Sequence, residues 1–211
     1  MEFQEVIKNR RGTHVFSDKP IDDQVLAAII KDAQRAPSWA NAQATKVYIA
    51  TGETLKKIKA DHAASKGSGN SDIPTLHRQA WGERALANQG ALMGSWKEFL
   101  GDMTQFGLSQ GKLFDAAAIA YFTVPKDAPQ WALIDLGAFY QTLMLAACNY
   151  GVSSMPAYEI VKFPEEIRKH MGVPDDECIA MGVALGYATD DKINQFVSPR
   201  VPVEDICTLK K

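Results

Sequence analysis

The segment from Trp131 to Tyr150 is apolar on nearly every side, and it limits what this chain can fold into more than any other stretch. Before Cys148, its strongly polar residues are Asp135, Gln141 and Thr142. A membrane span usually lacks an acidic residue near its start and has more Lys and Arg at one end than at the other. This segment has Asp135 near its start and no basic cluster at either end. A helix that is apolar all round otherwise lies in a protein core or at a subunit interface. The sequence therefore predicts a central helix covered by other elements or by a second copy of the chain.

Composition and charge favour one soluble domain whose function comes from a local site. The chain has 211 residues, 46% hydrophobic and 23% charged, with a formal net charge of −2. This length is ordinary for one domain, and the composition excludes a disordered or fibrous protein. No general basic field exists to attract nucleic acid or an anionic membrane. We expect a single domain over residues 1–211 that binds neither nucleic acid nor membrane.

Cysteine and histidine placement argues against a metal centre. Cys148, Cys178 and Cys207 are widely separated, and the four histidines show no ligand spacing. A zinc site or a disulfide framework would need closer or paired residues. The first twelve residues, MEFQEVIKNRRG, are charged and have no apolar signal region. These features favour a cytoplasmic protein without a bound metal.

Helical and strand-like patterns alternate along the chain. Apolar periodicity and Pro or Gly punctuation predict helices at 2–10, 22–35, 53–64, 131–150 and 164–170, and strands at 47–50, 116–124, 152–155 and 178–187. Gly182 and Gly186 within the last strand indicate close backbone packing. Residues 65–75 are rich in Gly and Ser and predict a mobile surface loop, with a lid as the alternative. Residues 76–110 are helix-prone but weakly periodic, and the tail 196–211 has no strong periodicity.

Two arginines beside a glycine stand at the end of the first predicted helix. Arg10 and Arg11 precede Gly12, Thr13 and His14. Guanidinium groups match phosphate oxygens, and glycine lets backbone approach a ligand closely. The alternative is a solvated basic patch at the C-terminus of a helix.

A second polar cluster follows the next helix. Pro37 and Ser38 form a turn that is followed by Trp39, Asn41 and Gln43. The two amides offer donors and acceptors that suit the edge of a flat heteroaromatic ring. The alternative is a plain turn between a helix and a strand.

Taken together, in order, these segments resemble the nitroreductase family of FMN-dependent oxidoreductases. The similarity rests on residues 10–16 (R-R-S-x-R-x-F in the family), 36–43 (A-P-S-x-x-N-x-Q), 137–151, 172–187 and Arg200. It covers nearly the whole chain, is weakest over 60–112, and is closest to the nitrobenzoate-reductase-like branch. The resemblance implies an α+β sandwich with a central, mostly antiparallel sheet flanked by helices, assembled as a homodimer with FMN at the interface.

The same resemblance assigns roles to individual residues. It places Arg10, Arg11 and Arg200 on the FMN phosphate. Pro37, Ser38, Trp39, Asn41 and Gln43 fall by the ring system and the subunit boundary, and Gln141 falls on the central helix. The segment Met155, Pro156, Ala157 and Tyr158 passes over the flavin, with the backbone N–H of Tyr158 at flavin N5. No residue is expected to act as a catalytic acid, base or nucleophile.

Two residues depart from the family pattern. Gly12 stands where the family often has Ser, which removes one hydroxyl contact to the phosphate. His14 stands where it usually has Arg or Lys, so we expect a weaker, pH-dependent cation that titrates near neutrality beside the flavin.

The implied activity is NAD(P)H-dependent reduction of nitroaromatics, quinones or similar flat acceptors by a ping-pong mechanism. Trp39, Phe106 and Tyr158 are candidate stacking walls for the acceptor, and ordinary core or interface aromatics are the alternative. Two other functions remain open: a flavin-binding sensor or storage protein without turnover, and a flavin-free protein whose arginines bind an acidic partner.

Overall fold

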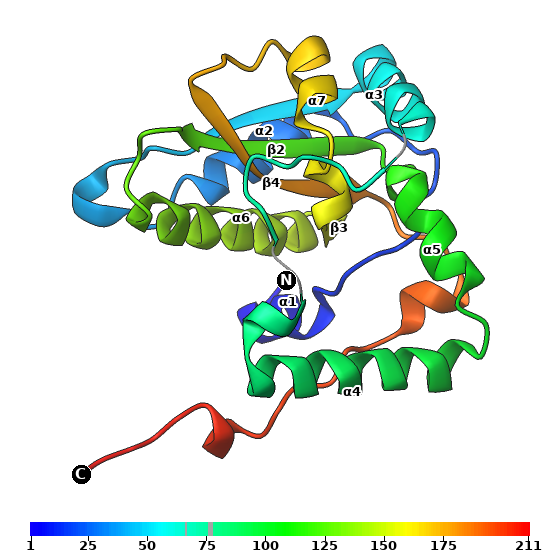
Figure 1. Cartoon of the computed structure of the whole chain (residues 1–211), viewed down its shortest axis with the longest axis vertical. Coiled ribbons are helices and arrows are strands. Elements are labelled where there is room, and N and C mark those ends of the chain that lie inside the picture. Colours follow the sequence, from blue (N-terminus) through cyan, green and yellow to red (C-terminus); the bar gives the residue numbers. More distant parts are fainter. Residues whose placement is uncertain (66, 76–77) are drawn as a thin grey trace.

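A four-stranded antiparallel sheet forms the centre of the molecule, as the computed structural model in Figure 1 shows. The structure describes residues 1–65, 67–75 and 78–211. The strand order is β1-β2-β4-β3, with strands β1 Lys46–Thr51, β2 Ala118–Pro125, β3 Ser153–Pro156 and β4 Glu177–Gly186. Almost all of β2 is buried, as its uninterrupted apolar sequence requires for a strand covered on both faces.

Helices cover both faces of this sheet. The helices in the described residues are α1 Phe3–Asn9, α2 Asp23–Ala33, α3 Gly52–Ala64, α4 Glu83–Leu100, α5 Thr104–Gly111, α6 Trp131–Asn149 and α7 Pro164–Met171, of which α2, α6, α3 and α7 pack on the sheet. Short 3₁₀ turns join them, including η1 Trp39–Asn41, η2 Arg78–Trp81 and η4 Tyr158–Val161. The predicted α+β sandwich with a mostly antiparallel sheet is confirmed, and the predicted helices and strands lie within two or three residues of those observed.

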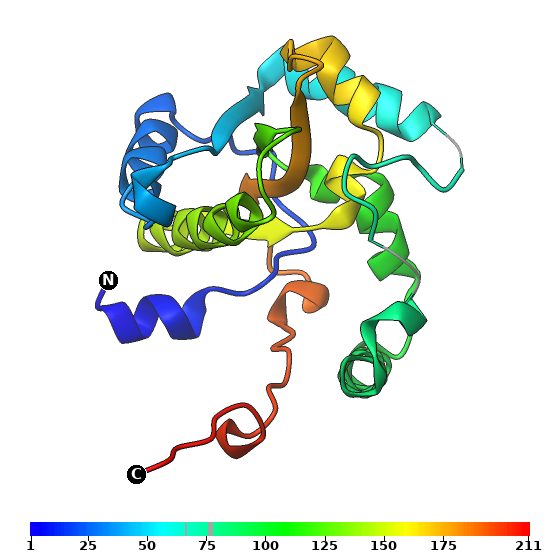
Figure 2. The ribbon, with the colours of Figure 1, turned by 60° about the vertical axis from the view of Figure 1, so that its left-hand side comes forward.

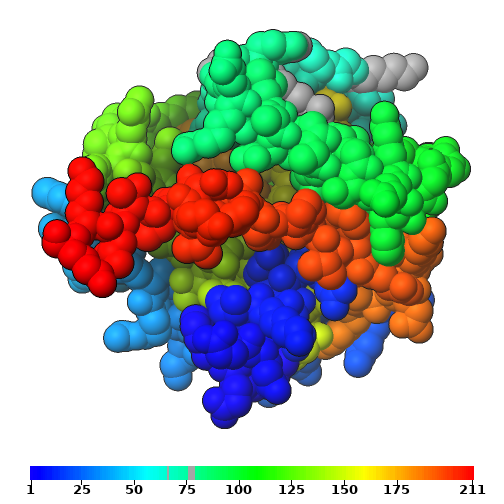
Figure 3. All heavy atoms as spheres, turned by 90° about the horizontal axis from the view of Figure 1, so that it is seen from below, coloured from blue at the N-terminus to red at the C-terminus, as the bar shows by residue number. Residues whose placement is uncertain are grey.

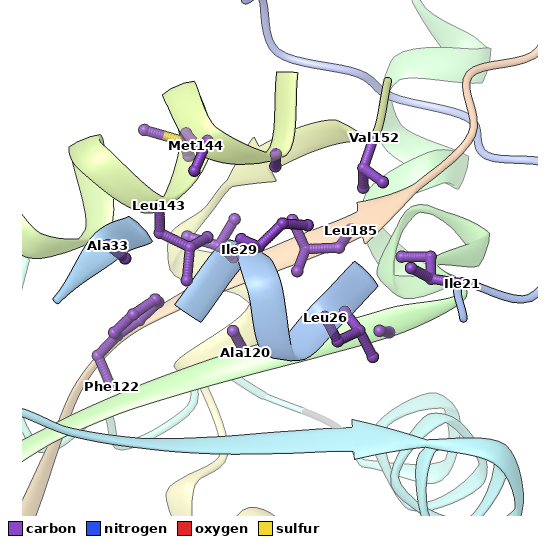
Figure 4. Packing of buried hydrophobic residues seen from close by; sticks show 14 of the residues in the cluster. Ile21, Leu26, Ile29, Ala33, Ala120, Phe122, Leu143, Met144, Val152 and Leu185 are labelled. Carbon is purple, nitrogen blue, oxygen red and sulfur yellow. The ribbon is translucent and has the colours of Figure 1, made fainter. Parts of the chain in front are cut away.

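Two apolar cores fill the sandwich, one on each side of the sheet. On one side α2 and α6 contribute Leu26, Ile29 and Leu143 against Phe122 and Leu185 of the sheet (Figure 4). On the other side, residues of α3, α7 and η4 pack on the opposite face of β2 and β4. Alternate residues of the same strands therefore serve different cores, in keeping with the period-two geometry of a strand.

Helix α6 is the core helix that its sequence predicts, but only along one face. Leu136, Leu143 and Ala147 are buried, whereas Trp131 and Ile134 are more than half exposed. Among the described residues α6 is the one helix long and apolar enough to span a membrane, yet its packing against α2 and β3 ties it to the sandwich. None of the described residues covers this exposed apolar face.

The weakly periodic segment 76–110 is more structured than its pattern indicates. Its described part contains η2, α4 and most of α5, with a break at Gly101, whose φ is +78°. Trp96 of α4 stacks on Phe196 with ring centroids 3.7 Å apart, so the helix is held by the start of the C-terminal tail. The rest of the tail projects away from the sheet (Figure 2) and crosses the lower face of the molecule between α1 and α4 (Figure 3).

Residues 67–75 differ from the mobile surface loop that their composition indicates. The N–H of Asn70 donates to the carbonyl of Lys162 at 3.0 Å. Asp72 forms an ion pair with Arg168, which is largely buried, and accepts the N–H of Ile179 at 2.7 Å. These contacts join the segment to η4, α7 and the free part of the β4 edge. They connect residues about 100 positions apart, which is why local composition does not reveal them.

Candidate functional site

The two arginines lie where the chain leaves α1 and runs beside β3. Gly12 pairs with Ser154 as an isolated parallel bridge, and the N–H of Thr13 donates to the Ser154 carbonyl at 3.0 Å. This pairing places Arg10 and Arg11 on the wall of a cavity of about 360 Å³. Other lining residues are Cys148, Ser153, Thr189, Asp190 and Asn194.

The arginines at this cavity form no ion pair within the described part of the chain, although the carboxylate of Asp190 also lines the cavity wall. No carboxylate there lies within ion-pair distance of Arg10, Arg11 or Arg200. Burial lowers the pKa of Arg10, and the nearby charge of Arg200 lowers it further. Guanidinium groups that repel one another in a partly buried cavity favour a multiply charged anion such as a phosphate.

Arg200 is near the pair but outside the cavity wall. Its guanidinium donates to the Ser198 carbonyl at 3.0 Å and to the Ser198 hydroxyl at 2.7 Å. It lines a neighbouring hollow between α4 and the tail together with Gln89 and Leu92. The charge of Arg200 thus lies near Arg10. Some of the N–H donors of Arg200 are already bonded within its own turn.

The segment Met155, Pro156, Ala157 and Tyr158 begins in β3, the strand that Gly12 joins, and runs into η4. The side chain of Met155 is buried, and the N–H of Ala157 donates to the Gly182 carbonyl at 3.3 Å. The N–H of Tyr158 has no acceptor among the described residues. A backbone donor is therefore available at the position where the resemblance expects flavin N5.

Gly182 lets this segment lie close to the sheet. A Cβ atom at this position would collide with Cγ2 of Ile160 in η4, and one at Gly186 would lie 2.8 Å from the Phe16 ring. The predicted close packing at both glycines is confirmed.

His14 lies in a buried aromatic cluster, which changes its expected charge state. Its ring is 7% exposed and lies among Trp96, Phe106 and Phe114, with centroids 5.0 to 5.8 Å away. Burial lowers the pKa of His14 to about 4, so the expectation of a group titrating near neutrality is wrong. The aromatic cluster also contains the partly buried Phe106, whose ring lies against those of His14 and Trp96.

The second polar cluster lies at the other end of α6. The N–H of Trp39 donates to Asp135 near the start of the helix, whereas Cys148, which lines the arginine cavity, stands near its end. Thirteen residues of helix separate them, or about 20 Å at the usual rise. Gln141 is exposed on α6 between these two points. One chain therefore carries the arginines and the amide turn as two separate clusters.

The amide turn has a strained backbone. Ala40, Asn41 and Gln43 have φ values of 45°, 60° and 48°, in the left-handed region. Such a conformation costs roughly 1–3 kcal/mol for each non-glycine residue and persists only where neighbouring structure holds it. Trp39, at the start of the turn, is 66% exposed. Asn41 and Gln43 are also exposed, so this side of the turn is open to a ligand or a partner.

Asn194 is a site residue that the sequence did not reveal. It is buried and accepts the N–H groups of His14 at 2.8 Å and Val15 at 3.1 Å. Its amide nitrogen donates to the Val15 carbonyl at 2.7 Å and to the Thr189 carbonyl at 3.1 Å. Asn194 thereby joins the segment at His14 and Val15 to the segment at Thr189, which lines the cavity. No local motif in the sequence marks Asn194.

Comparison with known proteins agrees with this architecture. The model of the nitroreductase family matches residues 7–187. The chain belongs to the nitroreductase family.

Individual relatives match over nearly their full length. The 4-nitrobenzoate reductase of Pseudomonas putida is 27% identical over 94% of this chain and 91% of its own. The chloronitrobenzene nitroreductase of Comamonas testosteroni is 26% identical over 97% of this chain and 95% of its own. The crystal structure of the FMN-dependent nitroreductase NfnB from Mycobacterium smegmatis in complex with NADPH superposes with a TM-score of 0.91. It is 22% identical and covers 99% of this chain and 97% of that one, which shows the shared fold.

Proposed function

We propose that this protein is an FMN-dependent oxidoreductase that uses NAD(P)H to reduce nitroaromatic, quinone or similar flat acceptors. The observation that carries the proposal is the pair Arg10 and Arg11, which forms no ion pair among the described residues, on the wall of a cavity beside β3. The names of the relatives, which are nitroaromatic reductases and FMN-dependent enzymes, support the same chemistry.

The residues present fit an FMN phosphate and ring. A phosphate dianion supplies the negative charge that Arg10 and Arg11 lack, and Arg200 adds to the field. The free N–H of Tyr158 offers a hydrogen bond to flavin N5, and the absence of a side chain at Gly12 keeps the backbone accessible. Bound FMN supplies the hydride-carrying chemistry between NAD(P)H and the acceptor, and the protein binds and orients the rings. No titratable side chain of this chain is needed to move a proton at the ring.

A homodimer would join the two clusters as half-sites of one complete site. The turn at Trp39–Asn41 and the cavity at Arg10 lie at opposite ends of α6, so we infer that a complete site takes its arginines from one copy and its amides from the other. The uncovered apolar face of α6, with Trp131 and Ile134, supports an interface there. Further exposed apolar residues occur on α1 and along the tail: Phe3, Ile7, Val197, Val203, Ile206 and Leu209.

Visible spectroscopy tests the activity directly. Purified protein reconstituted with FMN should show flavin absorbance that bleaches within seconds when NADH or NADPH is added without oxygen. Addition of 4-nitrobenzoate or a quinone should then restore the absorbance. Flavin bands that persist with both nucleotides would overturn the reductase and favour a flavin sensor or store. A protein that takes up no FMN would overturn the cofactor assignment itself.

A subunit-mixing experiment tests the shared site. Arg11→Ala damages one half-site and Asn41→Ala the other, so each variant alone should bind FMN weakly. When the two are mixed and allowed to exchange, each mixed dimer contains one site with both halves intact. About a quarter of all sites should then regain wild-type affinity. If both halves of a site came from the same chain, mixing would restore none.

A further inference from the structure

The turn that carries Asn41 and Gln43 cannot hold its shape by local preference alone. Ala40 and Gln43 occupy the left-handed region, where a side chain with a Cβ is disfavoured, and only Asn41 is a residue type that tolerates it well. Within the turn, the Ser38 hydroxyl accepts the N–H of Gln43 at 3.1 Å and closes the loop. That bond sets the internal geometry but does not orient the turn relative to the rest of the molecule.

Asp135 supplies a connection from outside the turn. Its Oδ2 accepts the N–H of Trp39 at 3.0 Å, across 96 positions of sequence. Asp135 stands beside Leu136, whose buried side chain anchors this part of α6 in the core. The rigid helix therefore fixes the first residue of the turn through one charge-assisted hydrogen bond.

The described residues around Asp135 show no other role for its carboxylate. Within the described ranges it forms no ion pair, although it is the one acidic residue of an otherwise apolar helix. It also borders a small cavity of about 140 Å³ enclosed by the turn and α6, with Ser38, Gln43 and Phe139. Among the described residues, the Asp135 carboxylate accepts only the backbone N–H of Trp39. Its role is therefore to hold the conformation of the turn that begins at Trp39.

We propose that Asp135 is a positioning residue for cofactor binding. By holding the N–H of Trp39 it fixes the strained turn so that Asn41 and Gln43 are presented, already ordered, to the flavin ring bound by a second copy of the chain. The inference rests on the proposed function and adds to it a residue that acts through the turn and does not itself touch the cofactor.

Three variants separate this role from a general effect on folding. Asp135→Ala removes the acceptor, and FMN should bind about 10- to 100-fold more weakly, as expected for loss of a charge-assisted hydrogen bond. Asp135→Asn keeps an oxygen that can accept the same N–H and should remain within about threefold of wild type. Asp32→Ala is the matched control, because Asp32 accepts the Tyr150 hydroxyl at 3.1 Å near the other end of α6 and should not alter FMN affinity.

A second pair of variants tests the same bond from the other side and does not touch α6. Trp39→Pro and Trp39→Ala both remove the indole, but only proline removes the N–H, and the extended backbone of Ser38 accepts a following proline. The proline variant should bind FMN more weakly than the alanine variant by about the factor that separates Asp135→Ala from wild type. Because this comparison leaves Asp135 in place, it stands even if Asp135→Ala fails to fold.

Rescue provides a readout that a merely structural role would not change. Ala40→Gly removes the cost of the left-handed conformation, so adding it to Asp135→Ala should recover part of the lost affinity. Hydrogen exchange at the Trp39 amide should be faster in Asp135→Ala than in wild type, and unchanged in Asp135→Asn.

The outcomes distinguish this inference from the proposed function. Wild-type FMN affinity in Asp135→Ala, or equal losses in the alanine and asparagine variants, would overturn the positioning role while leaving the cofactor assignment intact. Failure of the wild-type protein to bind FMN would overturn the proposed function instead.

Discussion

The Nδ1 atom of His14 lies 3.4 Å from the hydroxyl oxygen of Ser109, and that hydroxyl already donates to the carbonyl of Phe106 at 3.0 Å. The oxygen of Ser109 must therefore accept from His14, which assigns the proton of the neutral imidazole to Nδ1. Both the hydrogen bond and the three surrounding aromatic rings suit an uncharged ring. His14 is thus a buried polar member of the cluster that joins α4 and α5 to the sheet.

The neutral state of His14 predicts an acid-dependent loss of stability. Unfolded His14 has a pKa near 6.5, and burial lowers the folded value to about 4. The unfolded chain therefore binds a proton first, so the stabilisation is complete above pH 6.5 and is lost as the pH falls toward 4, by up to about 3 kcal/mol. Urea unfolding from pH 7.5 to 4 should show this decline, and His14→Phe should flatten it.

The uncharged state of His14 also changes the expected pH dependence of the flavin midpoint potential. Because His14 carries no charge from pH 6 to 9, the midpoint potential of bound FMN should show no His14-dependent step in that range. An NMR titration that finds the His14 imidazole protonating near pH 6.5 would contradict both statements.

The secondary structure was predictable because strong local signals mark it. The periodic apolar residues of α2 and α6, and proline or glycine at their ends, define helices in any environment. The apolar run of β2 likewise indicates a buried strand. The resemblance to a known family then supplied the mostly antiparallel sheet flanked by helices, which periodicity alone does not contain.

The features that escaped prediction depend on contacts between distant residues. Nothing near His14 in the sequence reveals that Trp96 and Phe106 enclose it, and nothing near Asp72 indicates Arg168 as its partner. Asn194 joins two segments 180 positions apart. Such contacts decide the charge state of His14, which was misjudged from the family pattern, and the order of residues 67–75, which was misjudged from composition.

Removal of one cavity arginine should weaken binding of the phosphate specifically. Arg11→Ala should raise the Kd for FMN about 10- to 100-fold, because a charge-assisted contact to a dianion is lost. Its Kd for riboflavin, which has no phosphate, should change little. Arg35→Ala, at an exposed arginine beyond α2, is the control for net charge. Equal losses of FMN and riboflavin affinity would show that Arg11 does not hold the phosphate.

A methyl group at Gly182 should disturb both stability and the cofactor site. The added Cβ would overlap Ile160 and force η4 away from β4, at a cost of about 1–3 kcal/mol. For a chain of this size each kcal/mol lowers Tm by about 2–4 °C. Since Tyr158 begins η4, calorimetry should show the lower Tm and redox titration a shifted flavin potential.

Gly12→Ala is the matched comparison for that experiment. Its Cβ would meet only the flexible end of Met155, at 3.2 Å from Cε and 3.4 Å from Sδ. Its Tm should stay within a few degrees of wild type. Equal destabilisation by the two substitutions would contradict the assigned packing.

Loss of the Asp72 carboxylate should release the segment 67–75. Asp72→Ala leaves Arg168 largely buried without its main partner and frees the N–H of Ile179, so we expect a destabilisation of about 3 kcal/mol or more. Hydrogen exchange at the Ile179 amide should accelerate well beyond the change in global stability. Asp61→Asn, which weakens a more exposed pair with Lys169, should leave that amide protected.

Strand β1 lies at one end of the described sheet and pairs only with β2, so its outer edge has unused backbone donors and acceptors. Beside it, Leu26, Ile30, Val47 and Ile49 line an open groove of about 500 Å³. An accessible strand edge next to apolar side chains is a template for indiscriminate pairing with other chains. Newly synthesised chains should therefore be prone to aggregate through this edge until a charged residue or a bound segment blocks it.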